Sequence, residues 1–303
     1  MRVAAIDCGT NSIRLLVADI EDGRLVDADR RMEIVRLGEG VDRTGRLDAA
    51  ALERTFAACR RYAAVIADLG AQRVRFVATS ASRDADNAAD FTSGVREILG
   101  VAPEVVSGLV EADLSFVGAS RSLPDLPAPA LVVDIGGGST EFVLGSGHAQ
   151  QSVSVDMGCV RMTERHIRSD PPRAEELDAI GRDVDDLIAR AGAQVDLAAA
   201  ACLVGLAGTV TTVSAIAQRL PAYDPAAIHG SVIAADQVHD VARQLAGMTR
   251  AQRLAMPVMH PGRADVIVAG AQILDRIVSA AAVPAVIVSE HDILDGIAWS
   301  LAS

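Results

Sequence analysis

One pattern of residues occurs twice in the chain and carries groups that could bind an anion. AAIDCGTNSIRLLVAD begins at Ala4, and LVVDIGGGSTEFVLGS begins at Leu131. Aligned without a gap, Asp7 coincides with Asp134, and the small residues of the two turns coincide as well. Glycine and small residues let backbone N–H groups approach an anion closely. We interpret the repeat as two phosphate-facing hairpin turns, one per domain, that face each other across a cleft; the alternative is coincidence, because glycine-rich turns after strands are common.

The candidate phosphate-binding residues lie in these two turns and in a third loop. The third loop, GLAGTVTTVSAI, begins at Gly205; it follows a strand and opens a helix. Its N–H groups and the helix dipole would point at phosphate, although an ordinary helix start capped by threonine would look the same. The candidates are Gly9, Thr10, Asn11, Ser12, Gly136, Gly137, Gly138, Ser139, Gly208 and Thr209.

Apolar periodicity and turn residues predict the elements that must position these loops. Expected strands cover 3–7, 14–19, 24–35, 73–79, 103–106, 130–134, 141–145, 151–156, 202–206 and 285–288. Expected helices cover 48–69, 90–99, a segment after Ser107, 173–191, 209–220, 235–246, 263–282 and 292–301. Each half opens with a hairpin meander and then alternates strand and helix, which indicates an α/β chain built from two homologous halves.

A proline-rich stretch, SLPDLPAP at 122–129, is expected to connect the two halves. The first domain is therefore predicted to cover 1–121, together with a C-terminal helix at about 289–303. The second domain is predicted to cover 122–288.

Composition excludes several classes of protein. The net charge of −12 and the aromatic content of 3% argue against a protein that coats nucleic acid. The sequence contains no lysine, so P-loop NTPases and protein kinases are excluded, since both need one. The four cysteines are scattered, no apolar stretch is long enough to span a membrane, and the start resembles no signal peptide. We expect a cytosolic protein.

Several stretches together resemble the exopolyphosphatase / guanosine pentaphosphate phosphohydrolase (Ppx/GppA) family, in its short two-domain form. They are IDCGTNSIRLLV, ATSASRDADN, VSGLVEADLSFVG, VVDIGGGSTEFVLG, GCVRMTER, GLAGTVTT and RADVIVAGAQIL. They occur in family order from residue 6 to about 274, and the combination is highly specific. The resemblance implies two duplicated ribonuclease-H-like domains of the actin-like ATPase type, with a cleft between them.

The resemblance also implies residue roles. The family's catalytic glutamate is the second acid of an SGxEEAR motif, which corresponds to Glu111; without the resemblance, Glu111 would be read as an acid that complements the helix dipole. Arg83 resembles the family's cleft arginine. Val110, Asp113 and Leu294 depart from the family pattern.

A phosphohydrolase needs carboxylates for a metal and cations for the polyanion. Asp134 and Glu141, on strands joined by the GGGST turn, suit Mg²⁺, with help from Asp7, which is also expected among the substrate-binding residues. Arg14 occupies the place of Glu141 in the first copy, where it would bind phosphate oxygens. The expected reaction is Mg²⁺-assisted attack of water on the terminal phosphate of inorganic polyphosphate, with Glu111 as base.

Several alternatives stay open. Hydrolysis of guanosine pentaphosphate (pppGpp) is the sister activity of the family. An ATP-dependent kinase of the same superfamily, a phosphate-ligand sensor and an actin-like filament that has lost catalysis are further alternatives. We expect a homodimer that binds neither nucleic acid nor membrane, and the sequence does not determine the preferred polyphosphate length.

Overall fold

The structure is a computed structural model that describes residues 1–302. The chain forms two compact units: Met1–Gly118 with the C-terminal segment from Ile293, and Ala119–Asp292. The first boundary falls within helix α5 (Gly108–Ser122), which continues past it because the next proline is Pro124. The proline-rich stretch 122–129 thus belongs to the second unit, and both boundaries lie a few residues from their expected positions.

The first unit is built on a five-stranded mixed sheet with the order β3-β2-β1-β4-β5. The β1–β2 and β2–β3 pairs are antiparallel, and the β1–β4 and β4–β5 pairs are parallel. The strands are β1 (Arg2–Cys8), β2 (Ser12–Glu21), β3 (Arg24–Ile34), β4 (Arg73–Ala78) and β5 (Glu104–Val105). The helices are α1 (Val41–Thr44), α2 (Ala49–Leu69), α3 (Ser80–Arg83), α4 (Ala88–Leu99), α5 and α13 (Ile293–Ser300).

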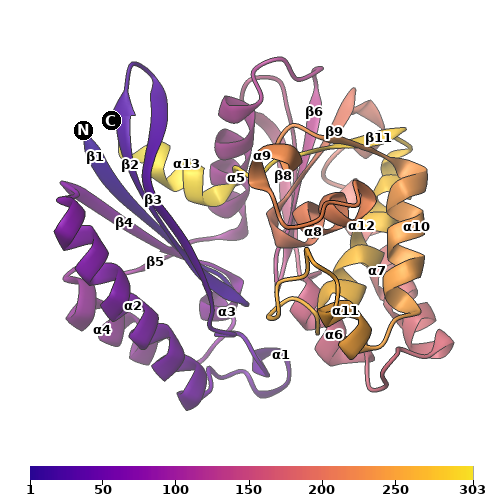
Figure 1. The fold of residues 1–303 in the computed structure, drawn as a ribbon, viewed down its shortest axis with the longest axis horizontal. Coiled ribbons are helices and arrows are strands. Elements are labelled where there is room, and N and C mark those ends of the chain that lie inside the picture. The colour runs from indigo at the N-terminus through magenta and orange to yellow at the C-terminus, as the bar shows by residue number, and fades with distance from the viewer. Residues whose placement is uncertain (303) are drawn as a thin grey trace. The chain divides into compact units, whose positions relative to one another are not determined.

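Helices α2 and α4 cover one face of this sheet and α13 covers the other (Figure 1). Strand alternation separates two apolar layers accordingly. Ala4 and Ile6 of β1 pack in the cluster that contains α2 and α4, whereas Val3 and Ala5 pack with α5 and α13. Since successive side chains of a strand point to opposite faces, Asp7 lies on the α5 and α13 face. The sheet thereby places Asp7 on the side covered by the helix that carries Glu111.

The second unit is built on a six-stranded mixed sheet with the order β10-β11-β9-β6-β7-β8. The β6–β9 and β9–β11 pairs are parallel and the others are antiparallel. The strands are β6 (Ala130–Ile135), β7 (Thr140–Gly145), β8 (Ala149–Val155), β9 (Cys202–Leu206), β10 (Val232–Ala234) and β11 (Ala285–Val288). The helices are α6 (Cys159–His166), α7 (Ala174–Gly192), α8 (Ala207–Ala217), α9 (Pro225–Ile228), α10 (Ala235–Ala246), α11 (Arg250–Leu254) and α12 (Ile267–Ala281), with a 3₁₀ turn at Leu197–Ala199.

The large apolar cluster of the second unit packs on one face of its central strands. Val133 and Ile135 of β6 and Phe142 of β7 belong to the large apolar cluster that includes α7, α10 and α12. Asp134 and Glu141 alternate with these residues, so they lie on the opposite face of the sheet. The strand alternation therefore places the charged pair on the face opposite this cluster, beside Val132 and Val143, which are buried as well.

The expected strands and long helices are confirmed, with differences at their ends. Helix α2 begins after Asp48, whose carboxylate accepts hydrogen bonds from the N–H groups of Ala50 and Ala51, and ends at Gly70 in the left-handed conformation. Helix α12 begins at Ile267 rather than near 263, because a turn precedes it. Helix α6 and the shorter elements α1, α3, α9, α11 and β10 had no counterpart in the sequence-based expectation. Among residues 1–302, no helix is both long and apolar enough to span a bilayer.

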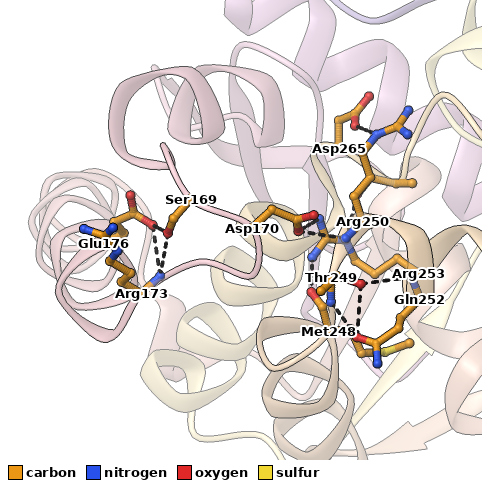
Figure 2. Close-up of polar contacts among 11 residues, drawn as sticks. Ser169, Asp170, Arg173, Glu176, Met248, Thr249, Arg250, Gln252, Arg253 and Asp265 are labelled. Carbon is orange, nitrogen blue, oxygen red and sulfur yellow. Dashed lines mark hydrogen bonds and ion pairs between the residues drawn. The ribbon is translucent and has the colours of Figure 1, made fainter.

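A polar network connects the segment after α6 with α11 (Figure 2). Asp170 accepts a hydrogen bond from the Arg250 N–H (2.7 Å) and forms an ion pair with Arg253 (3.5 Å). Arg253 is buried, and it donates to the carbonyls of Ala264 (2.9 Å) and Met248 (2.5 Å). Burial lowers the pKa of Arg253. The network holds the backbone beside Arg263, a residue whose surroundings are described below.

We predict that Gly296→Ala destabilises the first unit. A Cβ at Gly296 of α13 would lie 2.0 Å from the carbonyl oxygen of Leu114 in α5, a backbone atom that moves only with its helix. Overpacking of this kind costs about 1–3 kcal/mol in the free energy of unfolding. Gly192→Ala is the control, since its Cβ would meet only Leu197 at 3.9 Å. Equal thermal unfolding temperatures for the two variants would contradict the prediction.

Candidate active site

The turn at 9–12 in the first unit is held through its carbonyl groups. Its ends are joined by a hydrogen bond from the Gly9 N–H to the Ser12 carbonyl (2.9 Å). The Thr10 carbonyl accepts from the Gly38 N–H (2.9 Å), and the Asn11 carbonyl accepts from two N–H groups of residues 35 and 36 (3.1 and 2.9 Å). In a planar trans peptide the N–H points opposite to the carbonyl. The N–H groups of Asn11 and Ser12 therefore lie on the side of the turn away from segment 35–38.

The turn at 136–139 in the second unit has the same construction. The Gly136 N–H donates to the Ser139 carbonyl (3.0 Å), as Gly9 does to Ser12. The carbonyls of Gly136 and Gly137 accept from the first N–H groups of α6, namely those of residues 159–161, at 2.9–3.1 Å. The Gly138 carbonyl accepts from Arg161 Nε (2.7 Å). By the same peptide geometry, the N–H groups that follow these carbonyls lie on the side away from α6.

A glycine allows α6 to reach the second turn. A Cβ at Gly158 would lie 2.2 Å from the carbonyl carbon and oxygen of Gly137. Neither α6 nor the role of Gly158 was predicted from the sequence, although the stretch GCVRMTER contains both Gly158 and Arg161. The glycine that directly precedes Cys159 was the feature of the sequence that could have indicated this helix start.

The repeat differs at one cross-strand pair. Asp7 is opposite Arg14 in the β1–β2 register, and Arg14 Nη2 lies 2.6 Å from Asp7 Oδ2. Asp134 is opposite Glu141 in the β6–β7 register. Directly opposed residues of antiparallel strands have Cβ atoms about 4.5–5.5 Å apart. The first hairpin thus carries a neutralised pair, and the second carries two adjacent carboxylates.

The acidic pair is chemically suited to a divalent cation. Asp134 is 7% exposed and Glu141 is 1% exposed, and Glu141 Oε1 also accepts a hydrogen bond from Ser154 Oγ (2.7 Å). Opposed like charges destabilise a sheet, and a hard cation offsets them. Residues 1–302 contain no cluster of three or more His, Cys, Asp or Glu side chains suited to a metal. Two carboxylates nevertheless fit Mg²⁺, which usually takes one or two from the protein and retains water.

Arg14 and Asp7 are engaged with each other in the first unit. Both Nε and Nη2 of Arg14 donate to Asp7 Oδ2, at 2.9 and 2.6 Å. Thr10 Oγ1 of the adjacent turn lies 2.9 Å from Ser80 Oγ of α3. The geometry of this hairpin supports a role for Asp7 in orienting Arg14 beside the turn.

Glu111 and Arg83 form a second pair in the first unit. Glu111 is 8% exposed and lies in the first turn of α5. Arg83 ends α3, and its Nη1 donates both to the Val106 carbonyl (2.8 Å) and to Glu111 Oε2 (3.2 Å). The arginine thus holds the carboxylate beside the backbone that precedes α5. Such a fixed carboxylate can accept a proton from water.

The departures from the family pattern have different surroundings. Val110 is 40% exposed, and Asp113 is exposed as well, so both residues flank the buried Glu111 at the surface. Leu294 is 1% exposed and packs in the apolar layer with α5 and α13. Asn87, which matches a family stretch, binds the backbone N–H and carbonyl of Leu47 (2.8 and 3.1 Å) and is structural here.

The third loop, at the start of α8, contacts Arg263 from the segment before α12, an arginine that was not predicted from the sequence. A Cβ at Gly208 would lie 2.6 Å from Arg263 Cζ, so the guanidinium packs directly on this glycine. Arg263 Nη1 donates to Thr212 Oγ1 (3.0 Å), and its Cζ lies 5.8 Å from the Tyr223 ring centroid. Burial and the Glu290 carboxylate raise the pKa of Tyr223 to about 12. The stretch RADVIVAGAQIL, which begins at Arg263, was the available signal.

The two candidates of the third loop have different surroundings. Ala207, directly before Gly208, has φ of 66°, a conformation that is strained for a residue with a Cβ. Thr209 is 4% exposed, and its Oγ1 lies 2.6 Å from the place where a Cβ of Gly270 would be. Gly208 therefore lies against a cation, whereas Thr209 packs against α12.

Comparisons with known proteins agree with the sequence resemblance. Residues 16–303 match the Ppx/GppA phosphatase family. Exopolyphosphatase 2 of Mycobacterium tuberculosis is 49% identical, over 99% of this chain and 98% of its own. A solved exopolyphosphatase-like protein is 41% identical with a TM-score of 0.96, covering 99% and 98% of the two chains. The crystal structure of the Aquifex aeolicus member of the Ppx/GppA family is 31% identical with a TM-score of 0.83, covering 100% and 97%.

The family match covers residues 16–303, which include the second turn, the Asp134–Glu141 pair and the Glu111–Arg83 pair. The first turn and the Asp7–Arg14 pair precede residue 16 but lie within the 99% of the chain that aligns with the 49% identical relative. The fold is the duplicated α/β architecture of actin-like ATPases. The chain therefore belongs to the Ppx/GppA phosphatase family.

Proposed function

We propose that the chain is an exopolyphosphatase that releases orthophosphate from the end of inorganic polyphosphate. The observation that carries the proposal is the turn at 136–139. Its N–H groups are oriented by α6, and its flanking strands carry the Asp134–Glu141 acidic pair. A phosphate anion and its counter-cation need these two features side by side. The 49% identical relative named exopolyphosphatase 2 supports polyphosphate as the substrate.

In the proposed reaction, water attacks the terminal phosphorus and transfers a proton to Glu111. A bond forms between the water oxygen and phosphorus, and the bond from phosphorus to the bridging oxygen breaks. The shortened chain leaves as the anion. Arg83 keeps Glu111 in place and adds positive charge beside it. Phosphoryl transfer asks mainly for positioning and charge stabilisation, which these groups supply.

The remaining residues would bind the phosphate oxygens and the cation. We assign phosphate oxygens to the N–H groups of the turns at 9–12 and 136–139, to Arg14 oriented by Asp7, and to Arg263 beside Gly208. Mg²⁺ at Asp134 and Glu141 would offset the charge of the phosphate oxygens bound by the adjacent turn at 136–139. An acidic protein can bind a polyanion in this way because the binding would come from local N–H groups, arginines and a metal ion. The net charge of the whole chain would not decide it.

The proposal includes a cytosolic location and a homodimer. All four cysteines are free and buried, which supports a reducing compartment. Light scattering of the purified protein measures its mass in solution, and a monomeric mass would remove the homodimer from the proposal.

One assay tests the proposed function directly. Phosphate release is measured with short polyphosphate, long polyphosphate, pppGpp and ATP, side by side and with Mg²⁺. We expect polyphosphate to have the highest kcat/KM. A higher value for pppGpp would assign the sister activity, and hydrolysis of none of the four would support a sensor or filament.

We predict that Glu111→Gln lowers kcat by about 10²–10⁴-fold, because general-base catalysis typically contributes that much. The substitution keeps the shape and one hydrogen-bond acceptor but removes the base. Polyphosphate binding should persist, since a negative charge beside the substrate is removed. Glu104→Gln is the control, because Glu104 is an exposed carboxylate of the same unit, paired with Arg75. Near-parental phosphate release by Glu111→Gln would exclude this residue as the base.

We predict that activation by Mg²⁺ depends on the carboxylates of Asp134 and Glu141. Asp134→Asn and Glu141→Gln should each raise the Mg²⁺ concentration for half-maximal rate by at least about tenfold, since loss of even a ligand's hydrogen-bond partner costs 10–100-fold in affinity. Each should also lose the Mg²⁺-dependent rise in unfolding temperature. Asp186→Asn, at an exposed position of α7, is the control. If both variants titrate with Mg²⁺ like the parent, the metal is bound elsewhere.

We predict that catalysis requires a guanidinium group at position 83 and that a positive charge alone is not sufficient. Arg83→Ala should lower kcat/KM more than Arg83→Lys, because lysine keeps the charge but loses the fixed planar group that binds the Val106 carbonyl and Glu111 together. Steady-state phosphate release measures both variants. Arg96→Ala, on the exposed face of α4, controls for loss of a surface charge. Parental rates for Arg83→Ala would make Arg83 a structural residue only.

A further inference from the structure

We infer that Arg161 is a positioning residue that sets the orientation of the Gly138–Ser139 peptide in the phosphate-binding turn. The inference rests on the proposed phosphate-binding role of the turn at 136–139. Arg161 Nε donates to the Gly138 carbonyl at 2.7 Å. The Ser139 N–H belongs to the same peptide plane and so points to the opposite side.

Comparison of the two turns shows why this carbonyl needs a partner. In the gapless alignment, Asn11 corresponds to Gly138. The Asn11 carbonyl accepts two backbone N–H groups, from residues 35 and 36. At Gly138 the donor is the arginine side chain. Arg161 thus does in the second unit what the backbone after β3 does in the first.

Because of its residue types, the second turn can change its peptide orientation more easily than the first turn can. The first turn contains Thr10 and Asn11, whose side chains restrict the backbone. The second turn has three successive glycines, 136–138, which adopt both signs of φ at little cost. A flipped Gly138–Ser139 peptide would present its carbonyl oxygen to the phosphate, and that oxygen repels an anion. An external hydrogen bond to the Gly138 carbonyl disfavours this conformation.

The position of Arg161 suits this role. Its backbone N–H donates to the Gly137 carbonyl (3.1 Å), so its own main chain is fixed against the turn. Its side chain is 11% exposed, and Nη2 lies 3.8 Å from Oδ1 of Asp156, a largely exposed carboxylate. A long side chain held on both sides loses little further freedom when it binds the carbonyl.

A series of substitutions separates the hydrogen bond from charge and packing. Arg161→Met keeps an apolar stem but has neither donor nor charge. Arg161→Gln keeps an N–H donor without charge, and Arg161→Lys keeps both the charge and a donor. Arg165→Met is the control, because Arg165 lies on the same helix and pairs with Asp183 at 3.0 Å. Circular dichroism and thermal unfolding check that each variant is folded.

The expected result is a rise in KM for polyphosphate with a smaller change in kcat. Arg161→Met should raise KM and the Kd for orthophosphate by roughly 10–100-fold, the typical value of a hydrogen bond to a charged group. Arg161→Gln or Arg161→Lys should restore part of the loss, and Arg165→Met should resemble the parent. A packing role alone would give a lower unfolding temperature without the split between KM and kcat or the partial rescue.

The inference and the proposed function fail in different ways. If the parent hydrolyses polyphosphate but Arg161→Met keeps parental KM and orthophosphate affinity, the inference is wrong and the function stands. If the parent releases no phosphate, tripolyphosphate binding measured by calorimetry tests the turn directly: weaker binding to Arg161→Met supports the inference without the reaction. If the parent neither hydrolyses nor binds these compounds, both are overturned.

Discussion

The candidate site depends on how the carbonyl groups of two tight turns are bound. In each unit, the segment after the third strand of the meander donates to these carbonyls, and planar peptides then place the following N–H groups on the other side. A glycine-rich turn without such contacts samples several peptide orientations, and only some present N–H groups. The proposed anion binding by the backbone thus depends on hydrogen bonds whose partners do not contact the anion.

Arginine side chains donate several of the hydrogen bonds that hold these backbone segments, in a chain that has no lysine. Arg161 binds the Gly138 carbonyl, and Arg54 binds the Val35 carbonyl (2.8 Å) within the segment that holds the first turn. Arg83 and Arg253 bind backbone carbonyls beside Glu111 and Arg263, respectively. A planar guanidinium can bind a carbonyl and still direct further donors or charge toward a second group. Lysine, a single point of charge, would serve these double contacts less well.

The duplicated hairpins show how one substitution within a repeat changes the chemistry of a sheet. The register of Asp7 with Arg14 equals that of Asp134 with Glu141. An arginine at the second position produces an internal ion pair that needs no cation from outside. A glutamate there places two buried carboxylates opposite each other, and the proposed hard cation would relieve their repulsion. The same backbone therefore supplies an oriented arginine in one unit and a proposed metal site in the other.

Local pattern was sufficient to predict most elements and both hairpins. Asp48 and Gly70 delimit α2 because each caps one end of the helix through hydrogen bonds to residues nearby in the sequence. The repeat alone placed Asp134 and Glu141 on paired strands, because an antiparallel hairpin of known turn length has one register. Glu111 and Arg83 were identified by resemblance to a family, since a glutamate in the first turn of a helix is too common to be distinctive.

Contacts between distant residues were decided by the tertiary structure. Helix α6 is short and its role depends on Gly158 meeting Gly137, an approach that no local periodicity reveals. Arg263 packs on Gly208 although 54 residues separate them, and Arg83 reaches Glu111 from the end of another helix. The sequence by itself determined most of the groups proposed to bind phosphate and metal, because residue types and turn lengths are local properties; Arg263 was not among them. Only the tertiary structure decided which carbonyl each arginine binds, because that depends on how sheets and helices bring remote segments together.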